Sequence, residues 1–222
     1  PEVEQTERHG VYIVGYTDGT FGPSRSMTRA EAAAIFARLL AEKNGDTIST
    51  AANTKFADIP AHAWYSGYVK YLSNNGITYG KSKTVFAPND AITRAEFTTM
   101  AVRFFDVYGD GDAEIMEQFS GFNDVSSGYW AAKYIKYAAL HGWINGYGDG
   151  SFHAEREINR AEVVTIVNRL LGREADEDYI ADNLRKLNTF PDVSRKHWAY
   201  YAVMEAANAH TAVLGENESW SK

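Results

Sequence analysis

The chain of 222 residues contains no cysteine, which excludes disulfides, zinc–thiolate sites, iron–sulfur clusters and thiol catalysis together. It has no run of about 18 apolar residues, so we expect no segment that spans a membrane. Residues 1–10 are polar and contain no signal-peptide core. A mature or truncated exported chain would look the same, so this start does not indicate a cytosolic protein.

Cationic side chains are in the minority, because 22 Lys and Arg stand against 29 Asp and Glu and give a net charge of −7. An acidic chain is a poor general binder of nucleic acid or of anionic membranes. Any anion that this chain binds must therefore be held by a local cationic site. Hydrophobic residues make up 45% of the chain, an ordinary value for a globular protein.

Motifs of common enzymes are also missing. The sequence contains no His-Glu-x-x-His, no Gly-x-Ser-x-Gly, no P-loop and no dinucleotide-binding fingerprint. Carboxylates are plentiful, but no pair stands out as the acid and nucleophile of a glycosidase. Residues 106–117 resemble a calcium loop only in part, because Tyr108 stands where an acid is needed. We therefore predict no enzyme, no cofactor and no metal site.

What the sequence does contain is a motif repeated three times, in two halves. One half reads Phe-x-Asp-(Ile/Val)-x4-Trp, and its tryptophans are 66 and 68 residues apart. The other half is a glycine loop that ends in Phe six residues after its first Gly and reaches an Arg eight residues later. The tryptophans are Trp64, Trp130 and Trp198, and the arginines are Arg29, Arg94 and Arg160. Three copies with constant internal spacing indicate a repeat protein.

The order of the halves predicts how the copies close. The first glycine-loop half has no Trp half before it, and the last Trp half has no glycine-loop half after it. We therefore predict that the two ends meet and close a pseudo-threefold ring, which would remove exposed repeat ends. The expected single module covers residues 1–222, with repeat 1 at 11–43 closed by 190–210, repeat 2 at 56–107 and repeat 3 at 122–171.

Local signals predict a mostly α fold. Thr28, Thr93 and Asn159 each precede a Glu by three residues, which is typical of a capping box at a helix start. The resulting helices at 29–43, 94–107 and 160–171 have apolar stripes that would pack as a central three-helix bundle. The Trp halves predict shorter helices at 64–75, 130–141 and 198–209, and residues 176–187 predict an extra helix, while 44–55 read as a polar loop.

Each of the three arginines is expected at the first helical position, beside the free N–H groups of a helix start. Such a helix end favours anions, and a guanidinium matches a carboxylate in two-pronged geometry. We therefore predict that Arg29, Arg94 and Arg160 bind an anionic ligand. The alternative is that each pairs with a nearby acid, such as Asp18 or Asp90, and only holds the fold.

The glycine loops would place Tyr16 and Tyr147 beside an arginine. The middle loop differs, because Lys83 stands where the other two loops have Asp, so one of the three sites is expected to differ chemically. The three tryptophans read most simply as core anchors, although an exposed edge of each would stack on a sugar ring. Asp58, Asp124 and Asp192 precede the expected short helices and read as helix caps.

Together, Gly-Tyr-x-Asp-Gly-Thr-Phe, Met-Thr-Arg-Ala-Glu-Ala and Phe-x-Asp-Val-x4-Trp-Ala resemble the S-layer homology domain, in three copies between Val11 and His210. The resemblance implies a pseudo-trimeric, mostly helical fold with grooves between adjacent repeats. It also implies extracellular, non-covalent anchoring of an exported protein to the bacterial cell wall. The usual ligand is a secondary cell-wall polysaccharide, often with a pyruvate ketal on N-acetylmannosamine.

In that family the Arg of the Thr-Arg-Ala-Glu motif is the principal anion-binding residue, which corresponds to Arg29, Arg94 and Arg160 here. Because no passenger domain is present, we expect the anchoring part of a longer protein. Two alternatives stay open at this point. One is a protein-binding surface scaffold or adhesin module, and the other is an enzyme that acts on wall glycan.

Overall fold

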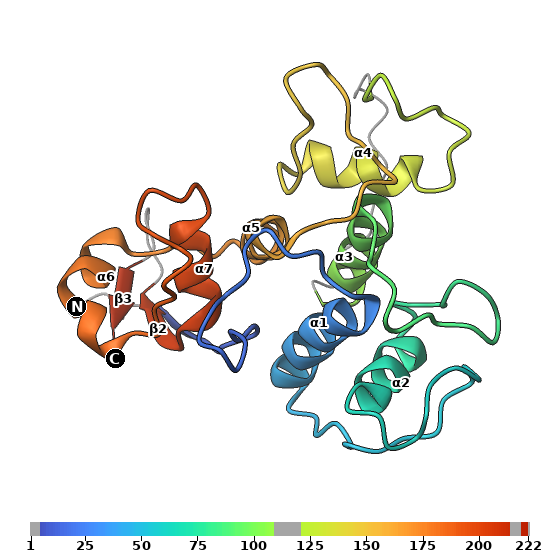
Figure 1. The fold of residues 1–222 in the computed structure, drawn as a ribbon, viewed down its shortest axis with the longest axis horizontal. Helices are drawn as coiled ribbons and strands as arrows, with labels where there is room; N and C mark the ends of the chain where they lie inside the picture. The colour runs from blue at the N-terminus through green and yellow to red at the C-terminus, as the bar shows by residue number, and fades with distance from the viewer. Residues whose placement is uncertain (1–4, 109–120, 214–218, 222) are drawn as a thin grey trace. The chain divides into compact units, whose positions relative to one another are not determined.

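The structure, a computed structural model, describes residues 5–108, 121–213 and 219–221, and the regular secondary structure of this part is mostly helical, as the sequence predicts (Figure 1). The helices are α1 (Arg29–Asn44), α2 (Ser66–Asn74), α3 (Arg94–Tyr108), α4 (Ala132–Leu140), α5 (Arg160–Leu171), α6 (Glu177–Asn183), the 3-10 turn η1 (Leu184–Lys186) and α7 (Tyr200–Ala207). The strands are β1 (Thr6–His9), β2 (His210–Val213) and β3 (Ser219–Ser221). Within the described ranges, no helix combines the length and apolar character needed to cross a membrane.

The chain divides into two compact units. Unit 1 combines residues 1–25 with residues 159–222, and unit 2 comprises residues 26–158. In unit 2, α1 packs against both α2 and α3, and α3 packs against α4 (Figure 1). In unit 1, α5 packs against α7.

The long helices begin where their capping boxes predict. The hydroxyl of Thr28 accepts a hydrogen bond from the amide of Glu31, and the Glu31 carboxylate accepts one from the Thr28 amide. The same reciprocal pair joins Thr93 with Glu96. Asn159 and Glu162 form it at the start of α5. Because each box satisfies two donors that a helix start leaves open, the sequence places these starts correctly.

The short helices of the Trp halves begin two residues later than predicted. A turn comes first: the amide of Ser66 donates to the carbonyl of Ala63, so Trp64 lies in that turn and not in α2. Equivalent turns precede α4 and α7. The expected extra helix at 176–187 is present as α6, capped by Asp176, followed by η1.

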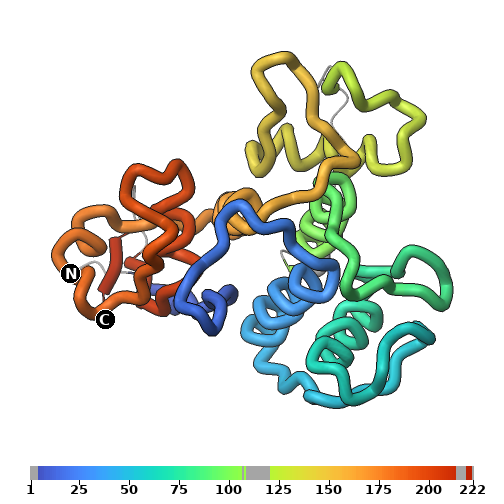
Figure 2. Tube along the Cα trace, viewed as in Figure 1, coloured from blue at the N-terminus to red at the C-terminus, as the bar shows by residue number. Residues whose placement is uncertain are grey.

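A small antiparallel sheet in unit 1 is absent from the sequence-based prediction. Its order is β1-β2-β3, and His9 of β1 lies opposite His210 of β2. The strands are three or four residues long and come from distant parts of the chain, so no local sequence pattern predicts them. The pairing brings the beginning of the described chain against residues 210–213 (Figure 2).

The two halves of each repeat meet at a glycine. At Gly146, an added Cβ would lie 2.4 Å from the Phe122 ring and 2.6 Å from the carbonyl oxygen of Ser151. Gly15 and Gly80 occupy the same position against Phe190 and Phe56. Only glycine fits this close approach, which explains why each loop begins with one.

Candidate functional site

The three arginines that open α1, α3 and α5 are almost fully buried, with 4%, 5% and 4% of their surfaces exposed. The Nε atom of each donates a hydrogen bond of 2.8–2.9 Å to the carbonyl oxygen of a loop phenylalanine. The pairs are Arg29 with Phe86, Arg94 with Phe152 and Arg160 with Phe21. Each arginine thus holds the glycine loop of the next copy, and the third pair returns to the first copy.

The amides at these helix starts are not free, so that expectation is wrong. The amide of Arg29 donates to the carbonyl of Asp90, and the amide of Ala30 donates to the carbonyl of Pro88. The same two bonds recur from Arg94 to Arg156, Ala95 to Ala154, Arg160 to Arg25 and Ala161 to Pro23. Any anion bound here must therefore be held by the guanidinium and not by the helix end.

The acid that pairs with Arg29 is Glu96, the capping-box residue of α3. Nη1 of Arg29 lies 3.0 Å from the Glu96 carboxylate. The expected partners lie elsewhere, since Asp18 faces Arg25 at 4.0 Å and Asp90 faces Lys81 at 3.0 Å. In the other two copies an Nη2 atom donates to a backbone carbonyl, of Asn145 for Arg94 and of Val14 for Arg160.

A small pocket of about 80 Å³ opens onto the buried Arg29 within unit 2. The exposed rings of Tyr79 and Trp130 contribute to its wall, with 55% and 54% of their surfaces in solvent. Thr99 also lines it, and its hydroxyl has no hydrogen-bond partner among the described residues. The pocket thus combines a guanidinium, an unused hydroxyl and two accessible aromatic rings.

A second guanidinium gives the pocket a net positive charge. Arg103 lines it beside Arg29, while Glu96 supplies the one carboxylate of the lining. The Arg103 guanidinium lies 4.7 Å from the centre of the Tyr79 ring and donates to the Tyr134 hydroxyl. Since Glu96 already occupies one edge of Arg29, an incoming carboxylate would share that guanidinium with it, and Arg103 would offset the repulsion.

The S-layer homology domain family matches residues 1–33, 55–98 and 121–164, more than half of the sequence. The chain belongs to the S-layer homology domain family. Its three matched segments contain the three capping boxes and the glycine loops described above.

Three curated relatives place this family member among surface proteins. Cell surface glycoprotein 1 of Acetivibrio thermocellus is 34% identical over 95% of this chain, and the cellulosome-anchoring protein of the same organism is 32% identical over 98%. The surface-layer 125 kDa protein of Lysinibacillus sphaericus is 32% identical over 72% of the chain. This chain spans only 9%, 46% and 13% of their respective lengths. Family and relatives indicate extracellular association with the cell wall.

The structure brings two of the predicted ligand-binding residues of the S-layer homology repeats, Arg29 and Trp130, into the described pocket. Tyr16 lies against Arg25 and Arg160, and Tyr147 lies 5.3 Å from the Arg94 guanidinium. Lys83 is exposed on the middle loop and does not line the pocket.

The tryptophans are not core anchors. Trp64, Trp130 and Trp198 are 54%, 54% and 65% exposed. Their side chains leave the core because they sit in the surface turns that precede α2, α4 and α7. The simple core interpretation is therefore wrong, and each repeat presents one indole to solvent.

Sequence reasoning missed Tyr79, Thr99 and Arg103 as pocket residues. A signal for the arginine was present, since Arg38, Arg103 and Arg169 each follow a helix-start arginine by nine residues. Tyr79 gave no repeated signal, because Val14 and Asn145 take its place in the other two loops. Of the imperfect calcium loop, residues 109–117 lie outside the described part of the chain.

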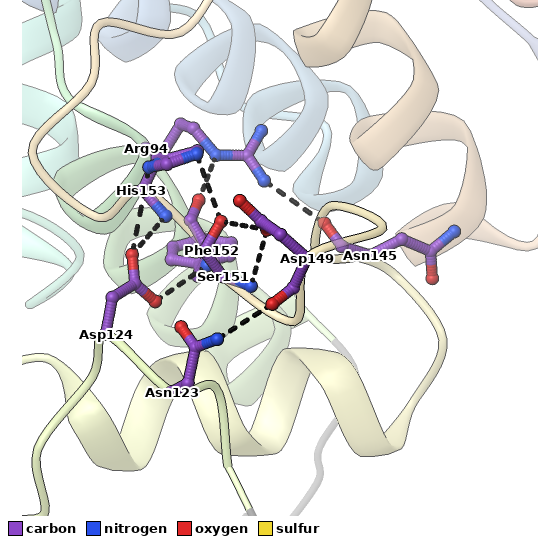
Figure 3. A network of polar contacts seen from close by, with 8 residues as sticks. All are labelled: Arg94, Asn123, Asp124, Asn145, Asp149, Ser151, Phe152 and His153. Carbon is purple, nitrogen blue, oxygen red and sulfur yellow. Dashed lines mark hydrogen bonds and ion pairs between the residues drawn. The ribbon is translucent and has the colours of Figure 1, made fainter.

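Asp58, Asp124 and Asp192 do not cap the helices that follow them. Each accepts two backbone hydrogen bonds at the end of a glycine loop, and the bonds to Asp124 come from Phe152 and His153 at 2.7 Å (Figure 3). The equivalent donors are Phe86 and Ala87 for Asp58, and Phe21 and Gly22 for Asp192. Figure 3 shows that this network also contains Phe152, whose carbonyl oxygen accepts a hydrogen bond from Nε of Arg94. The aspartate therefore fixes the loop that the arginine holds.

These contacts make part of the stability of the fold depend on pH. Burial raises the pKa of Asp124, but the hydrogen bonds from Phe152 and His153 outweigh it and hold the pKa below 3.8. The pKa of Asp192 is lowered in the same way by Phe21 and Gly22. A lowered native pKa means that the unfolded chain binds more protons than the native chain at acidic pH. Stability therefore rises as the pH increases through the pKa values of these aspartates.

We expect the free energy of unfolding to be fully developed above about pH 5 and to fall as the pH drops through the native pKa of these aspartates. Asp124→Asn should lower the free energy of unfolding at neutral pH by about 1.5–3 kcal/mol, because a charged acceptor is lost. The free energy of unfolding of this variant should then fall less on acidification than that of the native chain. Urea unfolding at a series of pH values measures both effects. Equal acid sensitivity of the variant and the native chain would contradict the assignment.

Proposed function

We propose that this chain is a non-catalytic module that anchors a larger exported protein to the cell wall by binding an anionic secondary polysaccharide, one that bears pyruvate ketals. The observation that carries the proposal is the pocket in which Arg29 meets the exposed rings of Trp130 and Tyr79. The relatives, an anchoring protein and two surface proteins by name, support the same conclusion.

The chemistry of the pocket suits an acidic sugar. A ketal carboxylate would bind Arg29 on the edge that Glu96 leaves open, and Arg103 would add a second positive charge. The Thr99 hydroxyl would bond a polar group of the sugar. The apolar face of the pyranose ring would stack on Trp130, since an indole buries much area at low entropic cost. Arginine and indole together would select an acidic glycan over a neutral one.

We further propose that the three copies form one pseudo-threefold module around a bundle of α1, α3 and α5, with Arg94 and Arg160 serving two further sites. The cyclic order of the arginine–phenylalanine pairs supports this closure, because the last copy holds the loop of the first. Tyr147 and Tyr16 would line the sites of Arg94 and Arg160. The exposed indoles of Trp64 and Trp198 would stack on sugar rings of the polymer. Lys83 would contact the polymer outside the described pocket.

Co-sedimentation with purified sacculi, before and after acid removal of their secondary polymer, tests the proposed ligand. We expect the chain to sediment with intact sacculi and to stay in solution with stripped ones. Soluble fragments with the pyruvate ketal should compete, and fragments without it should not.

Equal binding to stripped sacculi would overturn the polysaccharide proposal and would favour a protein or peptidoglycan partner. Competition by both kinds of fragment would overturn the role of the ketal. Release of reducing sugar from the sacculi would contradict a non-catalytic module.

A further inference from the structure

A buried cluster of two histidines and one glutamate lies in unit 1, away from the three helix-start arginines in sequence and outside the described pocket. His9 ends β1, His210 begins β2 and Glu205 lies on α7, and the antiparallel register places His9 opposite His210. The three residues are 3%, 6% and 1% exposed. Neither the family match nor the sequence motifs assign them a role.

The distances in this cluster are compatible with a metal-binding site. Nδ1 of His9 lies 3.3 Å from one carboxylate oxygen of Glu205, and Nε2 of His210 lies 3.3 Å from the other. One ligand atom from each residue can be chosen so that all three lie within 4.8 Å of one another. Bonds of about 2.0–2.2 Å in tetrahedral geometry separate neighbouring ligand atoms by about 3.3–3.6 Å, which matches the two histidine–glutamate distances.

The carboxylate of Glu205 lacks the hydrogen bonds that a buried charge requires. Within the described part of the chain, both of its oxygens are buried and neither accepts a hydrogen bond. A desolvated carboxylate is costly unless hydrogen bonds or a cation compensate it. A divalent cation between the glutamate and the two imidazoles would supply this compensation.

The surroundings of His210 orient its ring for such a role. Nδ1 of His210 lies 3.0 Å from the carbonyl oxygen of Asn208, and because a carbonyl only accepts, Nδ1 carries the proton. Nε2, the other ring nitrogen of His210, faces Glu205 and is the atom that would bind a metal ion. This backbone contact is typical of the outer shell of metal-binding histidines. The Trp220 ring stacks on the imidazole at 3.8 Å and fixes its plane.

We infer that His9, Glu205 and His210 bind one divalent transition-metal ion of the zinc class. Two imidazole nitrogens and one carboxylate suit Zn²⁺ or Co²⁺, whereas Ca²⁺ and Mg²⁺ prefer oxygen ligands throughout. The ion would tie the N-terminal strand to α7 and β2 and so stabilise unit 1, since binding to the native state alone raises apparent stability. This site is independent of the proposed polysaccharide binding.

Metal titration of the full chain, prepared without a histidine tag and freed of metal by chelation, tests the inference. We expect one Zn²⁺ per chain by calorimetry and a rise in melting temperature of about 5 °C at a hundredfold excess over Kd. Co²⁺ should give visible absorption bands with the intensity of a four-coordinate ion. Sacculus binding should be the same with and without metal, which separates this result from the fate of the proposed function.

Glu205→Gln keeps the shape of the side chain but removes the charge. It should weaken metal binding by about 100-fold or more, because losing only an outer-shell contact already costs about 10- to 100-fold in affinity. The matched control is His62→Ala, which removes an exposed histidine and should bind as the native chain does. Circular dichroism checks that both variants fold. If Glu205→Gln does not fold, the cobalt spectrum of the native chain tests the proposed ligands instead.

Two results would overturn the inference. Absence of one-to-one binding by the folded native chain would mean that the cluster is a protonated histidine–glutamate ion pair. Equal binding by folded Glu205→Gln and the native chain would mean an adventitious surface ion only.

Discussion

The chain in which Trp64, Trp130 and Trp198 are all replaced by alanine is expected to stay folded and yet to lose its retention on sacculi. Because more than half of the surface of each tryptophan residue is already in solvent, removing the side chain should change the free energy of unfolding by no more than about 0.5 kcal/mol per site. The same exposure leaves each ring free to stack on a sugar. Loss of one stacking contact should cost about 1–2 kcal/mol of binding, or about 5- to 30-fold per site.

The losses should multiply in the triple variant if one polymer occupies several sites, because each additional site binds as part of the same molecule. Sedimentation with intact sacculi at a series of chain concentrations measures the change. Trp130→Ala alone reports on the described pocket, and Trp130→Phe should recover part of the affinity because it keeps a stacking ring. The control is Val85→Ala with Leu140→Ala, which trims two exposed apolar side chains that do not line the pocket. Native retention of a folded triple variant would remove the tryptophans from the site.

The starts of the long helices were predictable because the signals that place them are local. A capping box acts within four residues, so Thr28 and Glu31 specify the start of α1 whatever the rest of the chain does. The glycine at the start of each loop is equally easy to find in the sequence. The need for it becomes clear only in the structure, where it contacts a phenylalanine of the other half-motif.

The contacts that decide the site were not predictable, because they join residues of neighbouring copies. The amides at the start of α1 have no partner in the local sequence, because their acceptors are the distant carbonyls of Asp90 and Pro88. Glu96 was recognised as a cap, but its second role, as the ion-pair partner of Arg29, depends on how α1 packs against α3. The exposure of Trp64 depends on a turn from Ala63 to Ser66 whose two central residues, Trp64 and Tyr65, are types that carry little turn signal.

Replacement of Arg29 or Arg94 by alanine is expected to destabilise the fold by about 3–5 kcal/mol, as for other buried charges whose partners are left behind. Arg29→Ala removes the hydrogen bond to the carbonyl of Phe86 and leaves Glu96 without its cation. Arg94→Ala removes the hydrogen bonds to the carbonyls of Phe152 and Asn145 (Figure 3). Urea unfolding followed by circular dichroism measures the loss. The control is Arg25→Ala, whose side chain is 56% exposed and 4.0 Å from Asp18, and which should cost no more than about 0.5 kcal/mol.

This expected instability governs how the binding role of the arginines can be tested. A chain that has lost Arg29 would fail to bind sacculi simply because its glycine loop is no longer held, so lost retention alone does not identify a ligand contact. Arg29→Lys separates the two roles in part, because an ammonium keeps the charge but lacks the planar fork that reaches Phe86 and Glu96 together. We expect it to lose less stability than Arg29→Ala and still to bind weakly. If Arg29→Ala instead kept native stability and lost all retention, the structural role assigned to this arginine would be wrong, and the guanidinium would serve the ligand alone.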